Sequence, residues 1–214
     1  MNLFLTSFTA YSLNKILPLL PKPPSELKVA FIPTASDLYK YRPWINTDKD
    51  ALVSAGFKVF EVGLQAPLDP DGFPIAGKDK LEAELRSELT EADIIFVAGG
   101  NTFYLLEQAQ KSGFLGIAQE LVEEGKIYIG SSAGSIITGP DIMPVEYFDE
   151  ISESNISSTR GLNWVDFVIL AHYDEKNPDP EFALSEAKYK DQFKILKLSN
   201  DDLVHVSKDE LKVI

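Results

Sequence analysis

The sequence predicts an α/β fold, a three-layer sandwich in which a mostly parallel sheet has helices on both faces. Short apolar runs alternate with segments of helical periodicity along the chain, as in chains built from strand-helix-strand units. One run, residues 93–98, is continuously apolar after Asp93, which is typical of a strand buried on both faces of a parallel sheet. With 214 residues, of which 44% are hydrophobic, we expect residues 1–214 to form one domain with a substantial core.

Proline and glycine mark the ends of the expected elements in the first half of the chain. A helix over residues 11–20 ends before Pro21, and a second helix runs through Ala55 to Gly56, a residue that tolerates the left-handed conformation after a helix. Residues 64–77 are rich in Pro, Gly and Asp and predict an irregular segment. We expect strands at 3–7, 28–33, 58–62 and 93–98, and a charged helix at 78–90.

The second half continues the alternation. We expect helices at 102–111, 115–125 and 181–190, strands at 126–129, 166–171, 203–206 and 211–213, and an acidic loop at 141–154. In open parallel sheets, ligands bind beyond the carboxyl ends of the strands. Polar residues that directly follow a strand are therefore the candidates for a functional site.

Composition excludes several classes of function. The net charge of −13 argues against nucleic acid or an anionic membrane as a partner, because phosphate binding requires clustered Lys and Arg. No apolar run is long enough to span a membrane, and residues 1–6 lack the features of a signal peptide, so we expect a cytoplasmic protein. The absence of cysteine excludes disulfides and thiolate chemistry, and with only two histidines we expect neither a metal nor a cofactor.

The most informative motif is Gly130-Ser131-Ser132-Ala133-Gly134, which follows an apolar strand and precedes a short helical segment. This is the G-x-S-x-G pattern in the strand-turn-helix context of a nucleophile elbow. Glycines on both sides allow the close backbone packing that such a sharp turn needs. The spacing makes Ser132 the candidate nucleophile, and the N–H of Ala133 would point to the position of a developing oxyanion.

A second motif, Ala98-Gly99-Gly100-Asn101-Thr102, follows the strand at 93–98. Two glycines before a helix leave backbone N–H groups free to face an anion. The same residues also fit a plain strand-to-helix turn in which Asn101 or Thr102 caps the helix. Capping and oxyanion binding can coexist here.

A general base is expected from His172, which directly follows the apolar run at 168–171. The other histidine, His205, lies in an alternating terminal strand on the face opposite Val204 and Val206, and we expect it to face solvent. The acid that would orient the histidine stays ambiguous. Asp141 follows Gly139-Pro140, whereas Asp201 and Asp202 precede a terminal strand.

Together these residues resemble the peptidase E family, the aspartyl dipeptidases, with cyanophycinases as more distant relatives. The resemblance covers roughly residues 28–206, and order and spacing agree over four motifs. These are the segments at 96–106, 130–135, 141–144 and 171–173.

The resemblance implies a class I glutamine amidotransferase-like fold with serine as the nucleophile. It implies Ser132 as nucleophile, His172 as base, and the N–H groups of Gly100 and Ala133 as the oxyanion hole. For the acid it suggests Asp141, which we favour, or a position near Asp201. Asn101 and Arg160 are the candidate substrate-binding residues.

The sequence departs from the family at two points. Asn200 stands where the aspartyl dipeptidases have a glutamate, unless Asp201 takes that place. The family favours an N-terminal aspartate, whose carboxylate calls for arginine, yet residues 174–193 contain lysine but no arginine. Aspartyl specificity is therefore not expected from this sequence.

The favoured function is a serine-type peptidase that hydrolyses small peptides as a monomer or homodimer. Two alternatives stay open: an esterase of the α/β-hydrolase type, which shares the elbow, and a binding or regulatory protein that keeps the scaffold without turnover.

Overall fold

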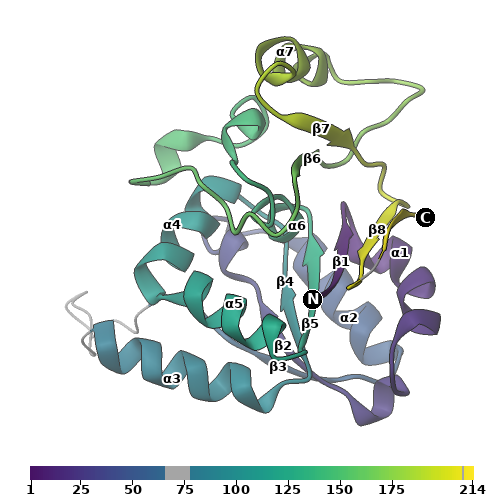
Figure 1. Ribbon diagram of the computed structural model, residues 1–214, viewed down its shortest axis with the longest axis vertical. Coiled ribbons are helices and arrows are strands. Elements are labelled where there is room, and N and C mark those ends of the chain that lie inside the picture. The colour runs from purple at the N-terminus through teal and green to yellow at the C-terminus, as the bar shows by residue number, and fades with distance from the viewer. Residues whose placement is uncertain (66–77, 209) are drawn as a thin grey trace.

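The computed structural model describes residues 1–65, 78–208 and 210–214, in which a central sheet lies between two layers of helices (Figure 1). The seven strands of this sheet follow the order β3-β2-β4-β5-β1-β8-β9. The first five in the chain pair in parallel, and β8 and β9 add to one edge in the antiparallel direction. The expected α/β three-layer fold with a mostly parallel sheet is confirmed. Its strands are β1 (Asn2–Thr6), β2 (Lys28–Ile32), β3 (Lys58–Glu61), β4 (Ile94–Val97), β5 (Ile127–Ser131), β8 (Leu203–Val206) and β9 (Leu211–Val213).

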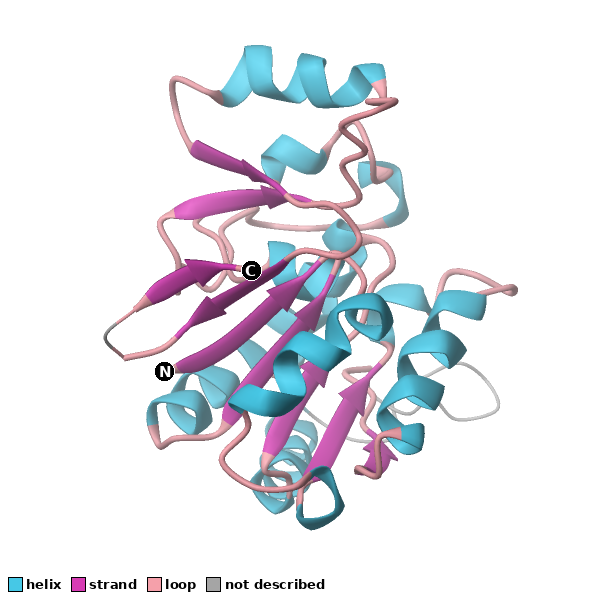
Figure 2. Cartoon of the chain, turned by 90° about the vertical axis from the view of Figure 1, so that its right-hand side faces the viewer, coloured by secondary structure: helices cyan, strands magenta, loops and turns pink. Residues whose placement is uncertain are grey.

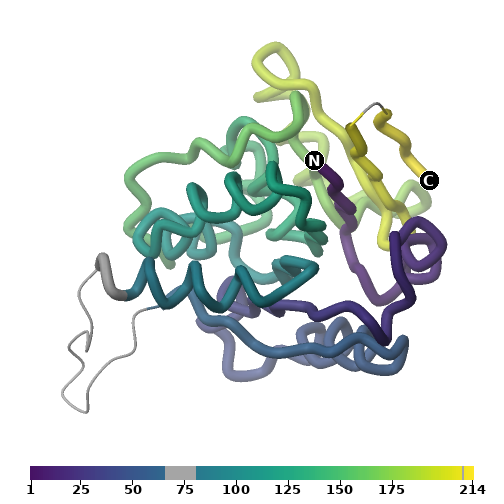
Figure 3. Tube along the Cα trace, turned by 60° about the horizontal axis from the view of Figure 1, so that its bottom comes forward, coloured from purple at the N-terminus to yellow at the C-terminus, as the bar shows by residue number. Residues whose placement is uncertain are grey.

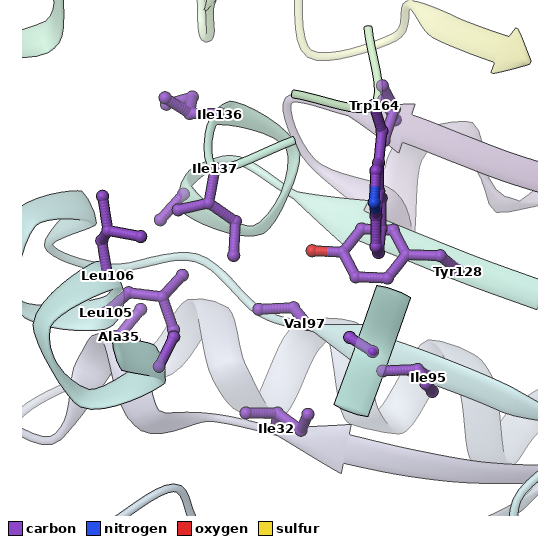
Figure 4. Packing of buried hydrophobic residues seen from close by; sticks show 14 of the residues in the cluster. Ile32, Ala35, Ile95, Val97, Leu105, Leu106, Tyr128, Ile136, Ile137 and Trp164 are labelled. Carbon is purple, nitrogen blue, oxygen red and sulfur yellow. The ribbon is translucent and has the colours of Figure 1, made fainter. Parts of the chain in front are cut away.

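Alternation along the strands divides the core between the two faces of the sheet. In β1, Leu3 and Leu5 face one helix layer whereas Phe4 faces the other, and all three are fully buried. Tyr128 of β5 packs edge-on against Trp164 within the first of these layers (Figure 4). That layer holds α3 (Lys78–Glu91), α4 (Thr102–Ser112) and α5 (Phe114–Glu123), and the other holds α1 (Thr9–Ile16) and α2 (Pro43–Ser54).

A second, two-stranded parallel sheet lies above the carboxyl edge of the main sheet (Figure 2). It consists of β6 (Phe167–Leu170) and β7 (Lys194–Lys197), which α7 (Pro180–Tyr189) connects. The sequence predicted the strand at 166–171 as part of a single, mostly parallel sheet, but this strand belongs to the smaller sheet. The sequence did not predict β7, because this four-residue strand begins and ends with lysine. Lys194 is exposed, and the other three residues are half-buried.

Most element boundaries agree with the sequence within a few residues, with some differences. The first helix ends at Ile16 and continues as a 3₁₀ turn, η1 (Leu17–Leu19). The acidic loop contains two further 3₁₀ turns, η4 (Met143–Val145) and η5 (Ile151–Glu153). Further 3₁₀ turns are η2 (Pro24–Glu26) and η3 (Thr34–Ser36). The expected irregular segment at 64–77 lies outside the described residues from 66 onward.

On one side of the sheet, α1 lies beside the C-terminal strand β8 (Figure 3). Lys15 of α1 donates from Nζ to the carbonyl oxygens of Asp201 and Ile214. His205 of β8 stacks on Phe4 at 4.6 Å between ring centroids and is half-buried, so its expected solvent-facing position was wrong. Within the described residues, no helix has the length and apolar character needed to cross a membrane.

Candidate active site

Ser132 occupies a strained turn between β5 and the single-turn helix α6 (Ala133–Ile136). Its backbone has φ 50° and ψ −113°, a region that non-glycine residues rarely adopt. The flanking glycines are sterically required, since a Cβ on Gly134 would lie 2.0 Å from the carbonyl oxygen of Val97 and one on Gly130 2.6 Å from the nitrogen of Ser135. The G-x-S-x-G pattern therefore corresponds to a real elbow that exposes the Ser132 side chain at the carboxyl end of β5.

Hydrogen bonds fix this elbow against the main sheet. The N–H of Ser132 donates to the carbonyl of Thr6 at the end of β1, and the N–H of Thr6 donates to Ser135 Oγ at 2.8 Å. On the other side, the buried Tyr128 hydroxyl donates to the carbonyl of Gly134 at 2.6 Å. The neighbouring Ser131 is buried, and its hydroxyl accepts from the Thr9 N–H, which is a structural role. Ser131 does not line the cavity.

Gly100 brings a second backbone segment beside Ser132. Only glycine fits at this position, because its φ is 144° and a Cβ would lie 2.2 Å from the carbonyl oxygen of Ala35. In the described part of the chain, neither the Gly100 N–H nor the Ala133 N–H has an intramolecular hydrogen-bond acceptor. The geometry thus leaves two backbone donors next to the serine, which is the composition of an oxyanion hole.

His172 contacts both Ser132 and Asn200. Its Nε2 lies 2.9 Å from Ser132 Oγ, and its Nδ1 lies 2.6 Å from Asn200 Oδ1. Parallel pairing of Leu170 with Lys197 explains the second contact, because the residues that follow β6 and β7 emerge side by side. An amide oxygen can only accept, so Nδ1 carries the proton and Nε2 is free to accept from the serine hydroxyl.

Ser7 links His172 to the main sheet. The fully buried Ser7 hydroxyl, directly after β1, accepts from the His172 N–H at 3.1 Å and donates to the Leu198 carbonyl at 2.9 Å. His172 has φ 65°, a left-handed conformation that is uncommon outside glycine and needs such support. One serine therefore joins the ends of β1, β6 and β7.

The prediction that Asp141 is the acid that orients His172 is corrected by the structure. Its two carboxylate oxygens accept from the Met143 N–H at 2.8 Å and the Thr159 hydroxyl at 3.1 Å, whereas Nδ1 of His172 contacts Asn200. Asp141 also forms an isolated backbone bridge with Arg160, so the two predicted site residues hold a surface loop together. Arg160 is exposed and does not line the cavity at Ser132, and its expected substrate contact is not supported.

Two other expectations also change. Asp201, the alternative acid, is exposed and contacts Lys15 through its carbonyl, while its neighbour Asn200 has the position beside His172. Asn101 is almost fully buried and uses both ends of its amide, since Oδ1 caps α4 at the Tyr104 N–H and Nδ2 donates to the Glu150 carbonyl. The capping interpretation of Asn101 describes this structure, and the substrate-binding one does not.

A cavity of about 550 Å³ opens beside Ser132 and His172. Part of its wall is apolar and largely aromatic, and three carboxylates share the rest with the glycine turn, Ser7, Ser132 and His172. The apolar group is Phe8, Tyr39, Trp44, Ile136, Val145, Phe148, Ala171 and Phe182, and the carboxylates belong to Asp48, Asp149 and Asp179. In the described ranges, no group of three or more His, Cys, Asp or Glu side chains could hold a metal ion.

Burial changes the electrostatics of two of these carboxylates. It raises the pKa of Asp48 to about 6, although bonds from Ser131 and the Ala10 N–H oppose the shift. It also raises the pKa of Asp149, against the opposing effects of a bond from Thr102 and the nearby charge of His172. Both groups therefore carry their negative charge in a poorly hydrated wall of the cavity.

Sequence reasoning missed Ser7, Asp48 and Asp149. Ser7 carried a signal that could have found it, because it directly follows a buried strand, like Ser132. Asp48 lies in the middle of α2, and Asp149 lies in a loop among many acidic residues. Neither position differs in sequence from an ordinary surface carboxylate.

Comparisons with known proteins find a matching family, related sequences and a similar structure. The family model of peptidase family S51 matches residues 3–214. The chain is 32% identical to the uncharacterized peptidase Lmo0363 of Listeria monocytogenes, over 98% of this chain and 96% of that protein. It is also 32% identical to peptidase E of Shewanella amazonensis, over 58% of this chain and 51% of the relative. A crystal structure of a Listeria monocytogenes protein that bears the name peptidase E superimposes with a TM-score of 0.86 and 28% identity, covering 100% of this chain and 97% of that one.

Proposed function

Because the chain belongs to peptidase family S51 and is a peptidase hydrolase, we propose that it cleaves small peptides, as a dipeptidase does, with Ser132 as its nucleophile. The observation that carries the proposal is the 2.9 Å contact between Ser132 Oγ and His172 Nε2 at an elbow where two backbone donors are free. A serine hydroxyl needs an adjacent base to become a useful nucleophile, and this contact supplies one.

The proposed reaction uses the chain's own groups. Ser132 Oγ attacks the scissile carbonyl carbon while His172 Nε2 takes its proton. The N–H groups of Gly100 and Ala133 stabilise the negative charge that develops on the carbonyl oxygen. His172 then gives the proton to the leaving amine, and water releases the acyl group by the same steps in reverse order.

Asn200 takes the place usually held by an acid in this proposal. Its Oδ1 keeps the Nδ1 proton in place and so maintains the tautomer in which Nε2 accepts from Ser132. Cysteine peptidases with a Cys-His-Asn arrangement show that an amide can perform this orienting role. A neutral amide stabilises the imidazolium less than a carboxylate does, so we expect modest turnover.

Hydrolysis of a dipeptide library, followed by release of free amino acids, tests the proposal. We expect the unmodified protein to cleave a subset of dipeptides and Ser132→Ala to lose about 10³-fold or more of that activity. Ser131→Ala is the matched control, since it removes the adjacent hydroxyl, and it should keep most of the activity. Equal activity in Ser132→Ala and the unmodified protein would contradict the assignment.

A further inference from the structure

We propose that the cavity beside Ser132 selects peptides with a free N-terminal ammonium group and an apolar, preferably aromatic, N-terminal side chain, and that Asp149 binds the ammonium group. This inference rests on the proposed peptidase function and names the substrate class of the same site. Charge, position and shape of the cavity wall carry it.

The charge of the cavity is negative. Asp48, Asp149 and Asp179 line it, and among its described lining residues none is lysine or arginine. His172 is the one lining side chain that can become cationic, and the proposed reaction needs it as a base. A positively charged group on the substrate is therefore the complement that this cavity lacks.

Asp149 is the carboxylate of the cavity wall that contacts the segment directly after the glycine turn, and it still has acceptor capacity. Its Oδ2 accepts from the Thr102 N–H at 2.9 Å, two residues beyond Gly100, and the nearby charge of His172 lowers the pKa of Asp149 against the effect of burial. A carboxylate offers about four acceptor positions, so this bond leaves room for a ligand. Asp48 is engaged with Ala10 and Ser131, and Asp179 is exposed at the start of α7, where it accepts from the Glu181 N–H.

The chemistry of the first peptide bond requires such a pairing. An unpaired carboxylate near the oxyanion hole opposes the negative charge that develops on the carbonyl oxygen. In a peptide cut after its first residue, the α-ammonium group is attached to the carbon next to that carbonyl. It can therefore pair with Asp149 and cancel the opposing charge, whereas an acetylated N-terminus cannot.

The rest of the wall fits an apolar N-terminal side chain. Phe8, Trp44, Phe148 and Phe182 provide aromatic surface, which binds apolar and aromatic groups. An N-terminal aspartate would bring a further negative charge into a wall with three carboxylates and no arginine. Acidic dipeptides should accordingly be poor substrates of this chain.

The test compares Phe-Ala, N-acetyl-Phe-Ala and Asp-Ala in two ways: as substrates, and as competitors that protect Ser132 from a fluorophosphonate probe. We expect kcat/KM for Phe-Ala to exceed that of each other peptide about tenfold or more. We also expect Phe-Ala alone to protect Ser132 at low millimolar concentration, on the order of ordinary KM values.

The variant Asp149→Asn separates ion pairing from structure, since its amide oxygen can still accept from the Thr102 N–H. It should reduce the preference for the free amine over the acetylated peptide to near one, with Asp166→Asn, an exposed carboxylate outside the cavity, as the charge-matched control. An unchanged preference in folded Asp149→Asn, or better cleavage of Asp-Ala, would overturn the inference. If Ser132 reacts with the probe but Phe-Ala neither reacts nor protects, this inference fails while the serine chemistry stands. If Ser132 of folded protein does not react at all, the proposed function itself fails.

Discussion

The nucleophile and the base of the proposed site come from two regions that are built differently. Ser132 and Gly100 follow neighbouring strands of the main sheet, and their backbone is fixed by glycines that no other residue can replace. His172 and Asn200 follow the two strands of the small sheet and are fixed by side-chain hydrogen bonds. Steric exclusion thus defines one half of the site, while a few polar contacts define the other. The first half should therefore fail abruptly on substitution and the second gradually.

The largest effect is expected from Gly134→Ala, because Gly134 belongs to the half of the site that steric exclusion defines. The added Cβ would lie 2.0 Å from the Val97 carbonyl oxygen, so the elbow or β4 must shift. We expect an unfolding free energy lower by about 3 kcal/mol or more, and loss of Ser132 reactivity. Gly116→Ala in α5 is the control, because its Cβ has no neighbour within 4 Å, and it should not destabilise the protein. Denaturant titration of both variants checks this, and similar midpoints would contradict it.

Asn200 offers a graded test of the half built by hydrogen bonds. Asn200→Ala removes the acceptor on Nδ1, so we expect kcat to fall about 10²-fold through loss of the reactive tautomer and orientation. Asn200→Asp supplies a carboxylate that stabilises the imidazolium, and kcat should rise about tenfold. Steady-state kinetics on one peptide measures both variants. A decrease in both would mean that the amide acts through packing and not through the imidazole.

Ser7→Ala tests the connection between the two regions. It leaves the His172 N–H and the Leu198 carbonyl without their shared buried partner, which costs about 1–3 kcal/mol of stability. We also expect kcat to fall about tenfold with a smaller change in KM, because the histidine loses its position while the cavity wall, which Ser7 helps to line, loses only one hydroxyl. Ser12→Ala removes another buried hydroxyl, on α1, and should leave kcat unchanged. Equal kcat values for the two variants would argue against a positioning role of Ser7.

The last expected effect concerns stability alone and depends on Asp48, whose pKa is raised from 3.8 to about 6 in the folded protein. Because the folded state holds this proton more tightly than the unfolded chain, ionisation costs stability as pH rises from about 4 to about 6. Above that range the cost is at most about 3 kcal/mol, at 1.36 kcal/mol per pKa unit. Asp48→Asn should therefore stabilise the protein at pH 8 but not at pH 4, as measured by denaturant titration. The same difference at both pH values would contradict this account.

The sequence predicted one region of the site better than the other for a physical reason. Strained backbone admits few residues, so Gly130, Ser132 and Gly134 are visible as a motif. The partner of His172 depends on β7, a short strand whose half-buried residues give no clear alternation. Asp141 was therefore favoured over Asp201, and Asn200 was not considered as the partner. The fold class was predictable because strongly apolar runs define the main sheet. The small sheet was not, since its pairing depends on contacts distant in sequence.

Mass-spectrometric mapping of a fluorophosphonate adduct tests the central claim most directly, namely that Ser132 is activated by His172. We predict about one adduct per chain on Ser132, lost in Ser132→Ala and strongly reduced in His172→Ala, with both variants folded by circular dichroism. An adduct on Ser131 or another residue would contradict the account. Equal labelling of Ser132 in His172→Ala and the unmodified protein would contradict it as well.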